Sequence, residues 1–206
     1  MGALRGPSRR YLVAKRALDL VVCSVLLLLA LPVMAACALA IRLDTAGPIV
    51  FAQMRTGRDA RRFRMWKFRT MVANAEDLKA GLAHLNVLPP PDFKIPDDPR
   101  ITRVGRFLRA TSLDELPQLV NVMRGNMSLV GPRPTSFPAT SYDLWHTQRL
   151  DVAPGITGLW QVEGRNEMTF DERLRLDAQY IRRMSLRTDV VLLARTAGAV
   201  LRRSGT

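Results

Sequence analysis

The chain has 206 residues, of which 31 are lysine or arginine and 18 are aspartate or glutamate, so its net charge is +13. A charge of this size indicates anionic partners such as lipid headgroups or nucleotide phosphates. Nucleic acid is not expected as a partner, because the cations form no single helix face with interleaved aromatic residues and no known binding motif is present. The two cysteines exclude a disulfide framework and a cysteine-based zinc site.

The most apolar segment is Leu20–Ile41, which holds 22 residues without a charge. A helix needs about 20 apolar residues to cross a bilayer. Basic residues flank both ends of the segment, and cationic flanks prefer the cytoplasmic side. Pro32, in its middle, removes a backbone hydrogen bond and favours a kink. We therefore predict a re-entrant helix that enters the membrane and returns, and an ordinary spanning helix stays open as the alternative. The expected division is a membrane segment at 1–43 and a catalytic domain at 44–206.

The remaining elements predict a mostly α domain with a small β element. Two alternating segments on either side of the turn at Gly57 indicate a pair of short strands. Basic and aromatic residues mix over Arg55–Arg69, which suits a membrane interface. Apolar residues at helical spacing predict the later helices. The expected strands are Ile49–Gln53 and Phe63–Arg69, and the expected helices are Val72–Leu85, Ile101–Arg109, Leu116–Arg124, Met168–Arg183 and Val190–Arg202.

Two interpretations of the acidic pair Asp114 and Glu115 follow from their place before an expected helix. Ser112 and Glu115 have the spacing of a capping box, and acidic residues favour a helix N-terminus, so the pair can be purely structural. The same helix end binds phosphate and favours an ionised carboxylate. An ionised Asp114 could then attack phosphorus and form a covalent intermediate, with Arg109 holding the phosphoryl oxygens.

Other candidate residues lie in loops. The turn Leu129–Pro134 presents Arg133, and the alternative is a plain proline-rich loop. Pro154–Val162 is a loop that enters an apolar strand, and its glycines would let the backbone approach a ligand. Gly164–Asn166 is a further turn with a cation. Two histidines far apart in the sequence, with no other metal-type ligand nearby, are interpreted as structural; they are His84 and His146.

Four long segments resemble one family, the bacterial sugar transferases, which are small monotopic phosphoglycosyl transferases. The segments are KRALDLVV, GPIVFAQMRTGRDARRFRMWKFRTM, DPRITRVGRFLRATSLDELPQLVNVMRGNMSLVGPRP and PGITGLWQVEGRN. The resemblance runs from about Lys15 to about Arg202, and the chain resembles the minimal form, without additional N-terminal membrane helices. One departure is Leu31-Pro32, where many members have Ser-Pro at the membrane kink.

The resemblance implies a re-entrant membrane helix, an active site at the cytoplasmic face of the inner membrane, and an Asp–Glu dyad at Asp114 and Glu115. It also implies Mg²⁺, held by Asp114, and places the basic KFR segment of the family at Lys67-Phe68-Arg69. The partners it implies are a nucleotide-sugar donor, a polyprenol phosphate acceptor and membrane lipids, and it allows a homodimer. The expected substrate-binding residues are Arg109, Lys67, Arg69, Arg133, Gly155, Thr157, Gly158, Gln161 and Arg165.

The predicted reaction is transfer of sugar-1-phosphate from a UDP-sugar to undecaprenyl phosphate, with release of UMP, as the first membrane step of polysaccharide synthesis. Asp114 is the expected nucleophile, and Glu115 is expected to position or deprotonate the lipid phosphate or to order the metal. Two other classes stay open. One is a membrane-anchored glycosyltransferase that moves only the sugar and releases UDP, and the other is a non-catalytic membrane scaffold.

Overall fold

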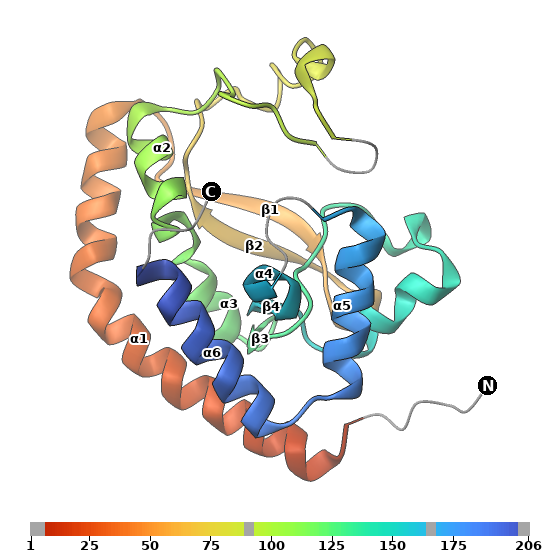
Figure 1. Ribbon diagram of the computed structural model, residues 1–206. Coiled ribbons are helices and arrows are strands. Elements are labelled where there is room, and N and C mark those ends of the chain that lie inside the picture. The colour runs from red at the N-terminus through yellow and green to blue at the C-terminus, as the bar shows by residue number, and fades with distance from the viewer. Residues whose placement is uncertain (1–6, 89–92, 164–167, 202–206) are drawn as a thin grey trace.

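The computed structural model describes residues 7–88, 93–163 and 168–201, and it confirms a mostly helical fold with a small β element (Figure 1). Figure 1 shows the long helix α1 curving along one side of the molecule, with the other elements gathered on its inner face. The elements are α1 (Arg9–Asp44), β1 (Val50–Thr56), β2 (Arg62–Phe68), α2 (Arg103–Ala110), α3 (Gln118–Met123), β3 (Ser128–Val130), β4 (Gly155–Thr157), α4 (Leu159–Glu163), α5 (Phe170–Arg182) and α6 (Leu186–Leu201), with short 3₁₀ turns between them.

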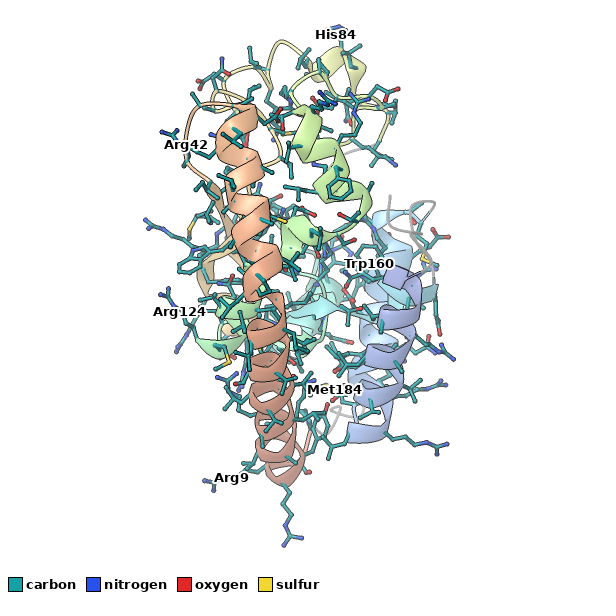
Figure 2. All side chains as sticks on the ribbon, turned by 90° about the vertical axis from the view of Figure 1, so that its left-hand side faces the viewer. Arg9, Arg42, His84, Arg124, Trp160 and Met184 are labelled. Carbon is teal, nitrogen blue, oxygen red and sulfur yellow. The ribbon has the colours of Figure 1, made fainter. Side chains whose placement is uncertain are left out.

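Helix α1 is one continuous element that begins after the cap Ser8 and runs through Pro32 without interruption. Among the described residues it is the one helix that is long and apolar enough to cross a membrane. Figure 2 shows its outer side, with Arg9 near one end and Arg42 near the other. Several large apolar side chains of α1 are exposed, with Leu28 at 69%. The apolar outer face is therefore not covered by the other described residues.

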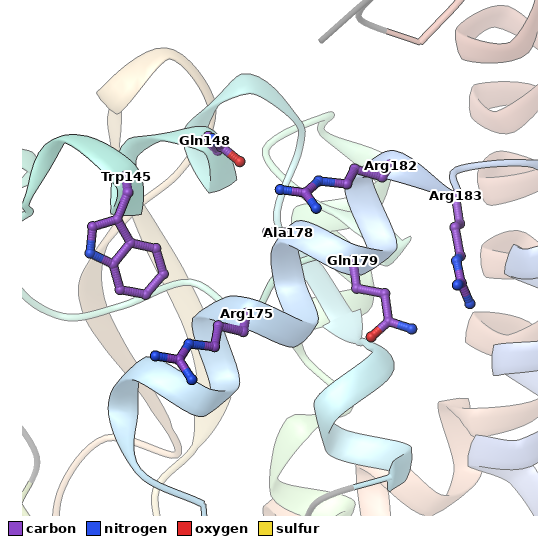
Figure 3. A pocket seen from close by; sticks show the side chains of 7 residues that line it. All are labelled: Trp145, Gln148, Arg175, Ala178, Gln179, Arg182 and Arg183. Atoms are coloured by element: carbon purple, nitrogen blue, oxygen red, sulfur yellow. The ribbon is translucent and has the colours of Figure 1, made fainter. Parts of the chain in front are cut away.

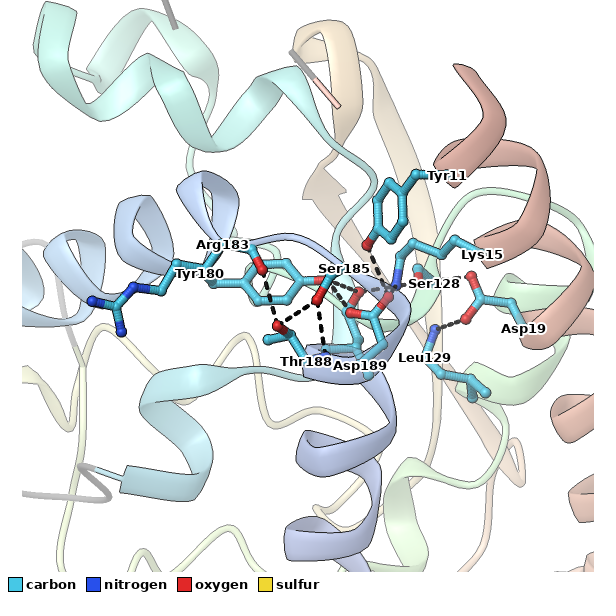
Figure 4. A network of polar contacts seen from close by, with 11 residues as sticks. Tyr11, Lys15, Asp19, Ser128, Leu129, Tyr180, Arg183, Ser185, Thr188 and Asp189 are labelled. Carbon is cyan, nitrogen blue, oxygen red and sulfur yellow. Dashed lines mark hydrogen bonds and ion pairs between the residues drawn. The ribbon is translucent and has the colours of Figure 1, made fainter. Parts of the chain in front are cut away.

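The N-terminal half of α1 is fixed to the domain by buried polar contacts (Figure 4). Lys15 Nζ lies 3.1 Å from the Asp189 carboxylate of α6, which also accepts hydrogen bonds from Tyr11 and Tyr180. Asp19 accepts a hydrogen bond of 2.7 Å from the Ser128 hydroxyl of β3. Because a buried charge is costly without a partner, these pairs hold α1 in one position against β3 and α6.

The C-terminal end of α1 is fixed to the same domain. Asp44 accepts a hydrogen bond from the backbone N–H of Val104, at the start of α2. The Arg69 guanidinium donates to the carbonyl oxygens of Thr45 and Ala46, just beyond the helix, at 2.6 and 2.8 Å. Both ends of α1 therefore contact one folded unit.

Strands β1 and β2 form an antiparallel hairpin, as their alternating sequences predict. Phe51 pairs with Lys67 and Gln53 with Met65, so these side chains share the inner face, where Met65 is buried. The side chain of Asn121 in α3 accepts from the Trp66 N–H and donates to the Arg64 carbonyl. This amide fixes β2 one residue before Lys67.

The apolar core joins α1, the hairpin and the C-terminal helices. Its largest cluster of buried residues draws on α1, β2, α3, β3, α5 and α6, and Figure 1 shows these elements meeting beside β3 and β4. Strands β3 and β4 are parallel and short, with Ser128 opposite Gly155 and Val130 opposite Thr157. The cluster consists of Cys23, Met65, Leu119, Val122, Met127, Leu129, Val130, Tyr180 and Leu192.

Some sequence predictions are wrong. The expected helix Val72–Leu85 is a series of turns that ends in a 3₁₀ turn at Ala83–Leu85, held by bonds such as that from Lys79 N to Glu76 O. Most of its side chains are exposed, so no packed face stabilises a regular helix. The apolar segment after Gly158 forms α4 instead of a strand. The expected helix Ile101–Arg109 begins only at Arg103, and Arg100 pairs with Asp98 before it.

Candidate active site

The acidic pair lies in a 3₁₀ turn, Leu113–Glu115, between α2 and α3. Ser112, which precedes this turn, has φ of 57°, a left-handed conformation that is uncommon outside glycine. Its side chain makes no capping hydrogen bond, so the capping-box interpretation is wrong. Asp114 is 7% exposed and Glu115 is partly buried. Backbone strain and buried carboxylates are features that cluster at functional sites.

Two cations from distant parts of the chain converge on this pair. Lys67 Nζ of β2 lies 2.8 Å from Glu115 Oε1 and 3.5 Å from Asp114 Oδ2. Arg133, in the turn after β3, donates to both oxygens of Glu115, with Nη1 3.3 Å from Oε2. The structure thus brings together four of the residues expected at the site, Lys67, Asp114, Glu115 and Arg133.

The two carboxyl groups differ in their electrostatic surroundings. Burial raises the pKa of Asp114, and the nearby Lys67 opposes this rise. Glu115 is also buried, but Arg133 and Lys67 outweigh that burial and hold its pKa well below the ordinary value. Glu115 is therefore a fixed anion that orders two cations. The charge of Asp114 is less strongly stabilised than that of Glu115, and such a difference between neighbouring carboxyl groups is typical of pairs with separate chemical roles.

Arg109 lies in the last turn of α2, near the dyad. Its Nε donates to the Thr70 hydroxyl at 2.9 Å, and its charge interacts with that of Asp114. Its side chain is exposed, so it can reach a bound anion. Arg109 therefore lies near the dyad, and its role in holding phosphoryl oxygens stays a prediction.

Arg69 is placed differently from its expected role. Its guanidinium donates hydrogen bonds to two carbonyl oxygens at the C-terminal end of α1 and to the Thr45 hydroxyl. It is not among the groups whose charge affects Asp114 or Glu115. The structure therefore assigns Arg69 to the attachment of α1, and we leave it out of the site.

The two glycines expected to approach a ligand approach the protein backbone instead. A Cβ atom on Gly155 would lie 2.1 Å from Gly131 N, and one on Gly158 would lie 2.5 Å from Gly131 O. They allow β4 to pack tightly against the segment that carries Arg133. This packing replaces the ligand contact predicted from the sequence.

The other loop candidates are also engaged with the protein. The Thr157 hydroxyl bonds that of Thr196 at 2.7 Å, and Gln161 donates to the Ile156 carbonyl at 2.9 Å. Arg165 lies outside the described residues. His146 is buried, with Nε2 3.4 Å from Asp171 Oδ1, and it belongs to an aromatic cluster rather than to the dyad.

Sequence reasoning missed Arg55 of β1. Its charge interacts with those of Arg133 and Glu115, which places it beside the dyad. The signal was available, because Arg55 and Lys67 share one face of the hairpin by alternation and register. It was obscured because Arg55 belongs to a long basic segment that also fits a membrane interface.

A cavity of about 450 Å³ lies elsewhere, between α5 and the 3₁₀ segment Leu144–Asp151 (Figure 3). Figure 3 shows Trp145 facing Arg175 across it, with Arg182 and Arg183 further along. None of the residues expected at the site lines this cavity. The described part of the chain also holds no group of three or more histidine, cysteine or acidic residues that could bind a metal by themselves.

The structure thus places a buried carboxylate beside a lysine and arginines, on a domain that carries a long helix with an exposed apolar face. A family model described as bacterial sugar transferase matches residues 10–203. The chain belongs to this family.

Three relatives show how the chain compares with longer proteins. It is 45% identical over 95% of its length to "Galactosyl transferase CpsE" of Streptococcus agalactiae, 44% over 96% to "Undecaprenyl-phosphate galactose phosphotransferase" of Salmonella typhimurium, and 41% over 96% to "UDP-galactose-lipid carrier transferase" of Erwinia amylovora. The chain spans 44%, 42% and 42% of these relatives, less than half of each.

Proposed function

We propose that this protein transfers sugar-1-phosphate from a UDP-sugar to undecaprenyl phosphate, with release of UMP, as the first membrane step of polysaccharide synthesis. The observation that carries this proposal is the buried Asp114 next to Glu115, with Lys67 and Arg133 in contact with the pair. Cations placed where phosphate charge gathers stabilise the transition state of phosphoryl transfer. The names of the Salmonella and Erwinia relatives support the same substrates.

The proposed reaction has two displacements at the same phosphorus atom. An Asp114 carboxylate oxygen attacks the β-phosphorus of the UDP-sugar, and the bond from that phosphorus to the bridging oxygen breaks, so UMP leaves with this oxygen. A phosphate oxygen of the lipid then attacks the phosphorus carried on Asp114. The bond to Asp114 breaks and the free carboxylate returns.

Glu115 serves this reaction by fixing cations. With both oxygens paired, it keeps Lys67 and Arg133 at the place where the phosphate groups bind. Arg109, on the side of Asp114, stabilises the charge of the departing or entering phosphate.

The residues present fit a magnesium ion that is shared with the substrate. Mg²⁺ is commonly held by one or two carboxylates together with substrate phosphates and water. Asp114 is the better suited of the two carboxylates, because Glu115 is already paired at both oxygens. When bound, the ion would neutralise part of the diphosphate charge.

We propose that α1 inserts into the plasma membrane from the cytoplasmic face and returns to it. Its N-terminal half is fixed by Lys15 and Asp19, and its C-terminal end by Asp44, all to one domain. A helix that crossed the bilayer would carry these two ends to opposite sides. The exposed apolar outer face would lie among lipids, and the dyad would then meet a lipid phosphate near the headgroups.

A panel of UDP-sugars, incubated with the purified chain and undecaprenyl phosphate, tests this function. UMP release with one or more of the sugars, dependent on the lipid, is the expected result. Release of UDP would instead favour transfer of the sugar alone, which the name of the Streptococcus relative makes the second candidate. No turnover with any of the sugars would contradict the proposed function.

A further inference from the structure

Arg55 is a partly buried cation whose partners are all neutral. Its Nη1 donates to the Pro134 carbonyl at 3.2 Å, and its Nη2 donates to the side-chain oxygen of Gln53. Its Nε is buried and has no hydrogen-bond partner within the described part of the chain. No described carboxylate lies within 4.0 Å of the guanidinium, although Glu115 is close enough for their charges to interact. The Nε donor is thus left without a partner among the described residues, and no carboxylate in contact with the guanidinium offsets its charge.

A second cation lies beside it. Burial, together with the positive charge of Arg133, lowers the pKa of Arg55 to about 10. The protein therefore holds two guanidinium groups together at an electrostatic cost. An unpartnered Nε is not sufficient by itself, because Arg69 also has one. Arg55 differs in lying beside another cation and the dyad, where Arg69 faces carbonyl oxygens of α1.

The charges around the dyad do not balance. Lys67, Arg109 and Arg133 interact with Asp114, and Arg55 interacts with Glu115. Four positive charges thus face two carboxylates, which leaves an excess of two positive charges. A phosphate monoester or a diphosphate carries a matching negative charge and several acceptor oxygens.

We propose that Arg55 and Arg133 together form a phosphate-binding subsite beside Asp114 and Glu115. Arg133 gives one guanidinium already oriented by Glu115, and Arg55 gives a second with a free donor. The ligand class follows from this charge and geometry. Its natural source, the phosphate of the nucleotide or that of the polyprenol, rests on the proposed function.

Binding of inorganic pyrophosphate to the 206-residue chain in detergent, without divalent cations, tests the subsite by calorimetry. A hydrogen-bonded charge is worth roughly one to two powers of ten in affinity. Arg55→Gln should therefore weaken binding about 10- to 100-fold, and Arg55→Lys, which keeps the charge, should weaken it less. Arg64→Gln is the matched control, because Arg64 is exposed on the opposite face of the same hairpin. Unchanged affinity in a folded Arg55→Gln protein, or an equal loss in Arg64→Gln, would overturn the proposal.

A measurement on the wild-type protein covers the case in which Arg55→Gln does not fold. The Nε–H resonance of Arg55 in a ¹⁵N-labelled sample should shift saturably as pyrophosphate is added, and no shift would reject the subsite. UMP and a short-chain polyprenyl phosphate then compete in separate titrations, and the competitor that displaces pyrophosphate identifies the source. Pyrophosphate binding that depends on Arg55, in a protein that releases no UMP from any UDP-sugar, would retain the subsite and reject the proposed reaction.

Discussion

At the scale of single residues, adjacent carboxyl groups have different tasks because they face different neighbours. Glu115 forms ion pairs with Lys67 and Arg133, so its negative charge holds both cations in place. Asp114 is less exposed, and among the described residues its one ion pair is with Lys67, at the longer distance of 3.5 Å. A nucleophile needs an oxygen that is free to form a new bond, which Asp114 provides better than Glu115, because both oxygens of Glu115 are paired.

Asp114→Asn should abolish turnover, with a loss of about 10³-fold or more. The amide preserves the shape of the side chain, but it does not attack phosphorus. UMP release measures the loss, and circular dichroism checks that the variant is folded. Wild type mixed with its UDP-sugar in the absence of lipid should gain the mass of a phosphosugar, which the variant should lack. Substantial activity in Asp114→Asn, together with no adduct on wild type, would indicate direct transfer between the two substrates.

Arg133→Gln should lower the stability of the protein by about 1.5–3 kcal/mol at pH 7, because Glu115 loses a charged hydrogen-bond partner. In wild type the folded-state pKa of Glu115 is depressed, so its pairing stabilises the protein above the unfolded pKa of about 4.3. This contribution is lost as the pH falls toward the folded pKa. The difference in Tm between wild type and variant should therefore be full at pH 6–7 and shrink below about pH 4. A difference that does not change with pH would show that Arg133 stabilises the fold without Glu115.

At the scale of elements, the segment that carries Arg133 is positioned by close backbone packing. Gly131 N donates to the Thr157 carbonyl and Gly155 N donates to the Pro132 carbonyl, both at 2.9 Å. The Tyr180 hydroxyl of α5 lies 3.2 Å from the Val130 carbonyl oxygen. Strand β4 and helix α5 thus hold both sides of the turn that presents Arg133 to Glu115.

Gly155→Ala should destabilise the protein by about 1–3 kcal/mol or more, because the new Cβ would meet the backbone of Gly131 and Thr157 at 2.1 and 2.5 Å. The turn that carries Arg133 must then move, so UMP release should fall as well. Gly81→Ala is the matched control, since its Cβ would meet only Leu78 O at 3.8 Å, and its stability should stay within about 0.5 kcal/mol of wild type. Equal Tm values for the two variants would mean that the close packing at Gly155 does not hold the turn.

The sequence predicted the parts of this arrangement that depend on neighbouring residues. Alternation predicted the hairpin, and the resemblance of the segment around Asp114 and Glu115 to the family marked this acidic pair, because both patterns are local. The contact of Arg133 with Glu115 joins residues 18 apart, and that of Lys67 with Glu115 joins residues 48 apart. Such contacts depend on tertiary packing. For the same reason the apolar spacing over Val72–Leu85 gave a wrong helix prediction, because most side chains of that segment are exposed in the structure.

At the scale of the whole molecule, the position of α1 decides how the active site meets the membrane. A straight helix of 36 residues would be about 54 Å long, more than the hydrocarbon thickness of about 30 Å. Figure 1 shows instead that α1 bends as it passes along the domain, with α2 against one end and α6 against the other. Inserting its outer face would keep both ends, and the dyad, on one side.

Cysteine labelling of cells that produce the protein tests this topology. The two native cysteines, Cys23 and Cys37, are 0% and 6% exposed, so they should react little with an impermeant maleimide. Arg10→Cys places an exposed thiol in the first turn of α1, and Ala60→Cys places one after the helix. Both should stay unlabelled in intact spheroplasts and react after permeabilisation, because the positive flanks and the domain contacts keep both ends in the cytoplasm.

Pro32→Leu adds a second arm to this experiment, because it restores a backbone donor and favours a straight helix. In this background the contacts of Lys15 and Asp44 with the domain oppose straightening, so part of the Arg10→Cys population, but not all of it, should become accessible from outside. External labelling of Arg10→Cys with Pro32 in place would instead mean that α1 spans the membrane. In that case the contacts of Lys15 with Asp189 and of Asp19 with Ser128 could not exist in the membrane-bound protein.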